Sequence, residues 1–156
     1  MLIEWLIAIE NTALVAYIRG SVAIYATVNA LHILGLALLI GAVLTFDLRA
    51  SGLWKVSRWR DGFEVAIPVA ASGLALAIAT GLLLFAVRGT HYVTLPIFLM
   101  KMAILPVGFL NIIICHRLVR RSGMALPSIG IRLCATLSAI VWICALFMGR
   151  WIAFSA

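Results

Sequence analysis

The fold of this chain is decided by residues 21–46, which read SVAIYATVNALHILGLALLIGAVLTF and contain no Asp, Glu, Lys or Arg. A helix rises about 1.5 Å per residue, so this stretch is long enough to cross about 30 Å of hydrocarbon. Three further apolar stretches of similar length follow at about 63–87, 92–115 and 131–154. The sequence therefore predicts an all-α integral membrane protein built as a bundle of four transmembrane helices.

The composition agrees with this fold class. Hydrophobic residues make up 65% of the 156 residues and charged residues only 11%, against about half and about a quarter in soluble domains. A soluble cytosolic enzyme is therefore excluded. The net charge of +7 does not indicate nucleic-acid binding, because the basic residues cluster where the apolar stretches end.

The first 20 residues form a shorter apolar stretch interrupted by Glu4, Glu10 and Asn11. We expect an amphipathic helix over 1–20 that lies in the membrane interface rather than crossing it. The loops are too short to fold alone, so residues 1–156 are expected to form a single membrane domain. All five acidic residues are assigned to termini or loops, which argues against a proton pump with a carboxylate inside a span.

Basic residues predict the orientation of the bundle. Three of them, Arg19, Arg88 and Arg150, fall on one side of the predicted spans. Eight fall on the other side: Arg49, Lys55, Arg58, Arg60, Arg117, Arg120, Arg121 and Arg132. The basic loops are therefore expected to face the cytoplasm and both termini to face outward.

Polar residues inside the spans are the candidates for function, because ionisable groups in a membrane are costly. His32 in the first span and Lys101 in the third are expected at similar depth in the outer half of the bundle. The predicted site consists of His32, Lys101, Arg150, Tyr25, Asn29, Gly35, Thr80, Gly81 and Trp142.

Each of these residues also has a structural interpretation. His32 can be a neutral histidine bonded to a neighbouring helix, and Lys101 can extend its side chain to the interface. Arg150 beside Trp151 is typical of an interfacial anchor, and the glycines are typical of helix packing. His91 and His116 are expected to be loop or interfacial residues.

The candidate site matches the needs of a b-type haem, which are an axial ligand, a flat slot and cations for its propionates. His32 is the expected axial ligand, Gly35 and Gly81 leave room, and Lys101 and Arg150 are cations nearby. His91 and His116 are each expected about 15 Å or more from His32 along the bundle, too far to bind the same haem with it. His32 is also the expected ligand if the protein binds copper instead.

Motifs along the whole chain resemble an uncharacterised bacterial family of four-span membrane proteins, catalogued as a domain of unknown function. The motifs are the runs 32–41, 47–49, 80–85, 98–101, 110–111 and 149–153. A weaker likeness is to HemJ-type protoporphyrinogen oxidases and CopD-type copper proteins. It rests on His32, on Arg49 at the end of that span, and on Lys101. This resemblance implies that His32 is a haem or metal ligand and Lys101 an essential site residue.

The leading hypothesis is a small protein of the bacterial inner membrane that binds haem b in the outer half of its bundle for redox or electron transfer. The alternatives are a protein that binds or transports copper or a small solute, and a cofactor-free structural subunit. The bilayer is the expected environment, and a homo-oligomer or another membrane redox subunit is the expected partner. No nucleic acid is expected.

Overall fold

A computed structural model describes residues 1–54, 61–122 and 127–155, and every regular element in these ranges is a helix. The helices are α1 (Leu2–Glu10), α2 (Ala13–Gly20), α3 (Val22–Ala50), α4 (Asp61–Tyr92), α5 (Pro96–Arg121) and α6 (Ile129–Ser155). The last four are long and apolar enough to cross a membrane. The predicted four-helix membrane fold is thus confirmed.

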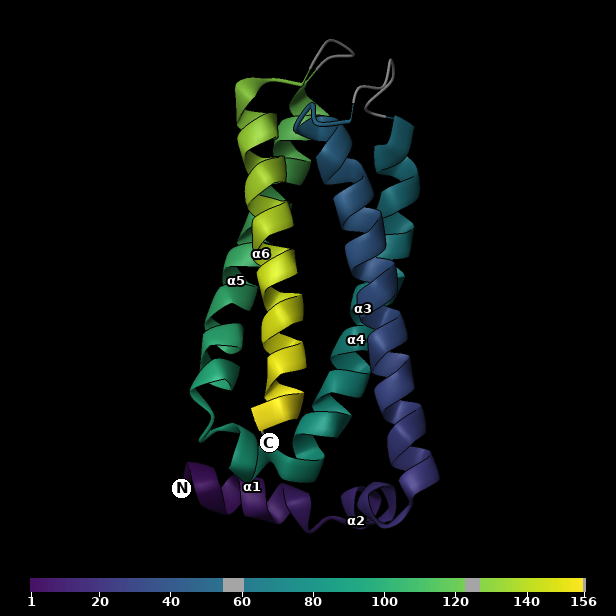
Figure 1. Ribbon diagram of the computed structural model, residues 1–156, viewed down its shortest axis with the longest axis vertical. Helices are drawn as coiled ribbons and strands as arrows, with labels where there is room; N and C mark the ends of the chain where they lie inside the picture. Colours follow the sequence, from purple (N-terminus) through teal and green to yellow (C-terminus); the bar gives the residue numbers. More distant parts are fainter. Residues whose placement is uncertain (55–60, 123–126, 156) are drawn as a thin grey trace.

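The four long helices form two helical hairpins that pack side by side (Figure 1). Helix α3 packs along α4, α5 packs along α6, and contacts between α3 and α6 join the hairpins. Over the described residues, α4 and α5 have few backbone contacts with each other. Aromatic rings meet between them at the two ends instead, with centroids 5.5 Å apart for Phe85 and Phe98 and 5.2 Å apart for Phe63 and His116.

Helices α1 and α2 lie across one end of the bundle, where both chain termini are also found (Figure 1). We refer to this end as the α1–α2 end and to the other as the opposite end. The expectation of one helix over 1–20 is wrong, because the chain leaves helical geometry at Thr12, whose φ and ψ are −67° and 149°. The amide of Thr12 and its hydroxyl both donate to the Ile9 carbonyl and end the first helix there.

The helices also differ from the predicted spans at several boundaries. Helix α4 continues past Val87 to Tyr92, and α5 continues past Cys115 to Arg121. Helix α3 continues past Phe46 to Ala50. The predicted start of the third span at Tyr92 is wrong, since Tyr92 ends α4 and Pro96 occupies the first turn of α5. Proline is favoured at that position because it needs no amide partner there. The turn between the two helices is itself largely apolar, so hydropathy alone does not show where one span ends and the next begins.

The predicted membrane orientation stays a prediction. Three of the basic residues behind it, Lys55, Arg58 and Arg60, lie outside the described residues. The structure does place both termini at the same end of the bundle, as four spans require.

The contact between α3 and α4 is closest at Gly35 and Gly73. A methyl group built on Gly35 would lie 2.7 Å from the Ala77 nitrogen, and one on Gly73 would lie 2.5 Å from the Leu39 nitrogen. Both distances are shorter than van der Waals contact, so the two backbones touch. In lipid, where apolar surface gives little driving force, such close backbone packing is a main source of helix association.

Gly35→Ala should therefore push α3 and α4 apart and lower the thermal unfolding midpoint in detergent. Overpacking of this kind costs about 1–3 kcal/mol. Gly41→Ala is the matched control, because Gly41 lies on the same helix and nothing is within 4 Å of its added methyl group. Equal midpoints for the two variants would contradict the backbone contact.

Helix α1 is tied to α4 by Glu10. Helix α4 breaks at Arg88, where φ is −144° and ψ is 38°. Just after the break, the Thr90 amide and hydroxyl both donate to Glu10 Oε1, at 2.7 and 2.8 Å. The amide bond lowers the pKa of the Glu10 carboxyl from its ordinary value of 4.5, and the Thr90 hydroxyl and the Arg19 charge act in the same direction against partial desolvation.

A lowered pKa in the folded chain means that the charged Glu10 stabilises this end of the protein above about pH 4.5 and loses that effect as the pH falls. Glu10→Gln should therefore lower the thermal unfolding midpoint at pH 7. Between about pH 5 and about pH 3, the midpoint of this variant should fall less than that of the wild-type protein. Glu4→Gln is the control, since Glu4 pairs only with the exposed terminal amine of Met1. If the two variants follow the same acid profile, the Glu10 bonds have no such role.

Candidate functional site

The imidazole of His32 is the centre of the candidate site. It extends from α3 toward α4, where His32 Nδ1 lies 3.1 Å from the Thr80 Oγ1 atom. The ring also covers Gly81, because a methyl group built there would lie 3.0 Å from His32 Cε1. The contact at Gly35, less than one turn from His32, brings these groups together. Of the predicted site residues, the structure joins His32, Thr80 and Gly81.

The hydroxyl of Thr80 determines which nitrogen of His32 carries the proton. A hydroxyl has a single proton to donate, and the Thr80 proton is directed to its own helix, with the Leu76 carbonyl oxygen 2.6 Å away. We infer that His32 Nδ1 is the donor to Thr80 and that His32 Nε2 keeps its lone pair. Metal-binding histidines are commonly held in this way, by a hydrogen bond from the second ring nitrogen.

Lys101 approaches the site from α5. Its amine lies against Gly149 of α6, where an added methyl group would be 3.1 Å from Nζ. The Lys101 charge is within electrostatic range of the His32 imidazole. Over residues 1–54, 61–122 and 127–155, Lys101 makes no hydrogen bond or ion pair. Lys101 is thus a partly buried cation, without an anion among these residues, within electrostatic range of His32.

Trp142 is buried in α6, with only 2% of its surface exposed. Its ring lies against Gly108 and meets Phe109 edge to face at 6.1 Å. The indole N–H of Trp142 is buried without a hydrogen-bond partner. Buried indoles usually find an acceptor, so this donor is a second unused polar group in the bundle.

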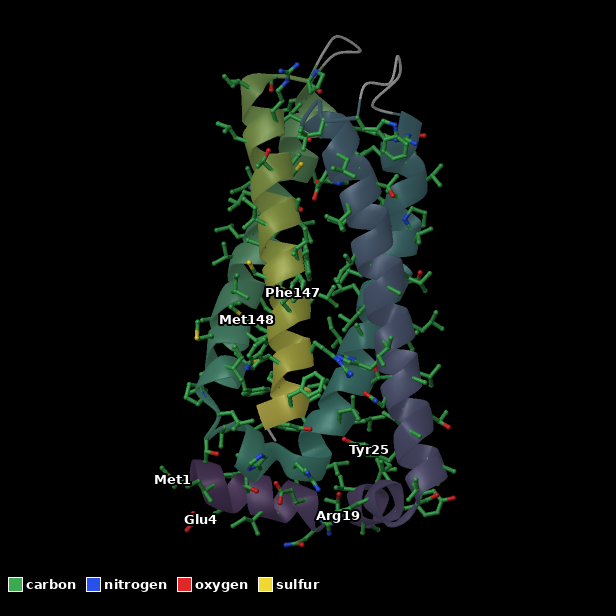
Figure 2. All side chains as sticks on the ribbon, viewed as in Figure 1. Met1, Glu4, Arg19, Tyr25, Phe147 and Met148 are labelled. Atoms are coloured by element: carbon green, nitrogen blue, oxygen red, sulfur yellow. The ribbon has the colours of Figure 1, made fainter. Side chains whose placement is uncertain are left out.

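The other predicted site residues do not join His32. The space beside Gly35 is occupied by the backbone of α4. Asn29 lies on the exposed side of α3. Tyr25 packs against the apolar cluster of α2 and α4 at the α1–α2 end, where Arg19 also lies (Figure 2). Arg150 is exposed, with its guanidinium 4.8 Å from the centre of the Phe154 ring.

The described residues contain no group of three or more His, Cys, Asp and Glu side chains that could hold a metal ion. The three cysteines, Cys115, Cys134 and Cys144, are free thiols. Near the α1–α2 end there is an open surface cavity of about 350 Å³, lined by Glu10, Arg19, Val87, Arg88, Thr90 and His91. It includes none of the predicted site residues.

Sequence reasoning missed one buried acid. Asp47 was expected at the end of a span, but it lies inside α3 with 3% of its surface exposed. Its position one and two turns after Val43 and Ile40, on the side of α3 that faces the bundle, is the signal that could have found it. Ser138 and Asn111 are also buried polar residues in this half, and the Asn111 amide donates to the Cys134 carbonyl oxygen at 3.0 Å.

The family of the chain follows from a comparison with family models. One model matches residues 3–155, nearly the whole sequence. The chain belongs to DUF6644, a family of unknown function. Membership in DUF6644 confirms the expected relationship to an uncharacterised family and assigns no activity to His32 or Lys101. No curated protein and no solved structure matches the chain. The likeness to HemJ-type and CopD-type proteins stays a prediction.

In this DUF6644 protein, removal of the Thr80 hydroxyl should remove the preference for a proton on His32 Nδ1. Nitrogen NMR of histidine-labelled protein, recorded where the imidazole is neutral, should show His32 protonated at Nδ1. Thr80→Val should give a mixture of both tautomers. Thr27→Val is the control, because the Thr27 hydroxyl is exposed and donates to the Ala23 carbonyl of its own helix at 2.8 Å. A wild-type His32 protonated at Nε2 would contradict the assignment.

Proposed function

We propose that the α1–α2 half of the bundle binds a b-type haem, with His32 Nε2 as an axial ligand, for redox or electron transfer. The observation that carries this proposal is the hydrogen bond between His32 Nδ1 and Thr80, which leaves Nε2 with an unused lone pair. A bound haem supplies one-electron chemistry at its iron. The role of the chain is to hold the imidazole in one orientation and one tautomer.

The set of available donors favours haem over an ion bound by the protein alone. Zinc and copper centres usually need three or four protein ligands. The described residues gather no such group. The porphyrin of a haem brings four nitrogen ligands of its own, so one fixed histidine is enough.

The surroundings of His32 suit a planar anionic cofactor. Gly81 has no side chain, so the His32 ring can pack directly against α4 at this position. Lys101 supplies a cation without a partner for a propionate, whereas Arg150 is already occupied by Phe154. Within the described ranges, α4 and α5, which carry Gly81 and Lys101, have few backbone contacts with each other. We infer that a flat ligand reaches His32 from this side.

The proposed setting is the bacterial inner membrane, with the α1–α2 end toward the periplasm. This orientation rests on the basic residues that follow α3 and end α5. The proposed partner is a second membrane redox subunit or another copy of this chain. The same free lone pair on His32 also supports the alternative of copper or solute binding.

The visible spectrum of the purified protein, after expression with added haem, tests the proposal. The wild-type protein should show a Soret band, and His32→Ala should abolish it. His91→Ala and His116→Ala are the controls and should keep the band, because His91 is exposed and His116 packs against Phe63 at the opposite end. Lys101→Met should keep the band but weaken haem retention.

Metal analysis of the same samples separates the alternatives. If the wild-type protein contains stoichiometric copper but shows no Soret band, and His32→Ala loses the copper, then the site binds copper and not haem. If the wild-type protein binds neither haem nor copper, and His32→Ala assembles normally, the results would support the alternative of a cofactor-free structural subunit. A Soret band that survives His32→Ala would contradict His32 as the ligand.

A further inference from the structure

Asp47 is the feature of the bundle that the haem proposal does not use. It lies in α3 near the opposite end, within a helix that is long and apolar enough to span a membrane. Its side chain is 3% exposed, and its Oδ2 atom is buried without a hydrogen-bond partner. The hydroxyl of Ser138 from α6, itself 4% exposed, faces the carboxyl. A buried polar pair therefore lies between the two hairpins.

No cation neutralises this carboxyl within residues 1–54, 61–122 and 127–155, where the one ion pair joins Met1 and Glu4. Arg49 on the same helix turns elsewhere, with its guanidinium 5.4 Å from the Trp54 ring and against Gly62 of α4. Helix α5 contributes the thiol of Cys115, which is within electrostatic range of Asp47.

The remaining neighbours of Asp47 are apolar or already bonded. Next to it is the apolar cluster of Phe46, Ala50, Cys115, Val119, Ile131 and Ala135, against which Phe63 and Ala66 of α4 and Cys134 of α6 also pack. The Asn111 amide is bonded to the Cys134 carbonyl. The described surroundings thus offer the carboxyl one hydroxyl and one thiol, but no positive charge.

A carboxylate buried without a cation is very costly, and such a group reduces the cost by taking up a proton. The neutral acid can donate one hydrogen bond, and a serine hydroxyl can both donate and accept. We propose that Asp47 and Ser138 form a proton-binding site that is loaded at neutral pH and exchanges its proton with the aqueous phase at the opposite end.

The position of Asp47 selects the side of exchange. The last residue of α3 is Ala50, so the carboxyl lies about one turn, or about 5 Å along the axis, from the end of its helix. His32 is about four turns away in the other direction, or about 22 Å, and the buried apolar residues Leu39 and Ile40 lie between. The proton site is therefore separate from the proposed haem site and does not depend on it.

The test uses isotope labelling, because the chain contains only two aspartates, Asp47 and Asp61. In Asp61→Asn protein labelled with ¹³C at the aspartate carboxyl, all label resides in Asp47. Infrared spectra at neutral pH should show a labelled carbonyl band of a protonated acid. The band should shift in D₂O, because the proton exchanges with water, and should be replaced by carboxylate bands at alkaline pH.

Three variants sharpen the result. Ser138→Ala should keep the acid band but change its frequency, since the hydroxyl partner is gone. Glu64→Gln, which removes an exposed acid near the same end, should leave the band unchanged. Asp47→Asn should remove it and also remove the loss of thermal stability that the wild-type protein shows as the pH rises, because the folded chain then holds no extra proton.

Three outcomes would overturn the proposal. Carboxylate bands from Asp47 at neutral pH would mean that the site is ionised. Carboxylate bands of Asp47 that shift in frequency on addition of Na⁺ or K⁺ would mean that the site binds a metal cation rather than a proton. An acid band that never shifts in D₂O would mean that the proton is sealed inside the bundle. None of these results depends on whether haem is bound.

Discussion

The close approach of the α3 and α4 backbones at Gly35 and Gly73 is the constraint on which the rest of this structure depends. It removes two side chains from the interface and brings one helix into contact with the main chain of the other. Less than one turn along α3, the same closeness places His32 over Gly81 and within hydrogen-bond distance of Thr80. A wider crossing would leave the imidazole free to rotate. The candidate ligand is thus positioned by helix packing and not by a dedicated loop.

The polar groups inside the bundle divide into satisfied and unsatisfied ones. The side chains of Thr80 and Asn111 bond to backbone carbonyls, as polar residues in membrane helices usually do. Among the described residues, Lys101, Trp142, Asp47 and Arg49 have unused donors or acceptors. In a low-dielectric interior such groups are costly unless a ligand, a proton or a partner completes them. Two separate proposals follow, one for each half of the bundle.

Much of the fold could be predicted from the sequence because hydropathy over about 20 residues is set by the bilayer itself. The boundaries were less certain where apolar turns join the spans, as between Tyr92 and Pro96. The His32–Thr80–Gly81 group was partly predictable, since depth along each helix follows from residue counting. Rotation of each helix about its axis does not, and this is why the sequence predicts Asn29 and Arg150 in the site although both are exposed. Gly35 does face α4, as His32 does, but the α4 backbone lies directly against it. For the same reason the sequence predicts Asp47 at the end of a span, although the residue is buried in the bundle.

The most direct test of the central claim is pulsed electron paramagnetic resonance of the haem-loaded protein, labelled with ¹⁵N histidine. The chain has only three histidines, and His32 is the one that contacts Thr80 and Gly81 in the bundle. Our account predicts magnetic coupling of the iron to a single imidazole nitrogen ligand, contributed by His32. Coupling to two imidazoles, or to none, would contradict it.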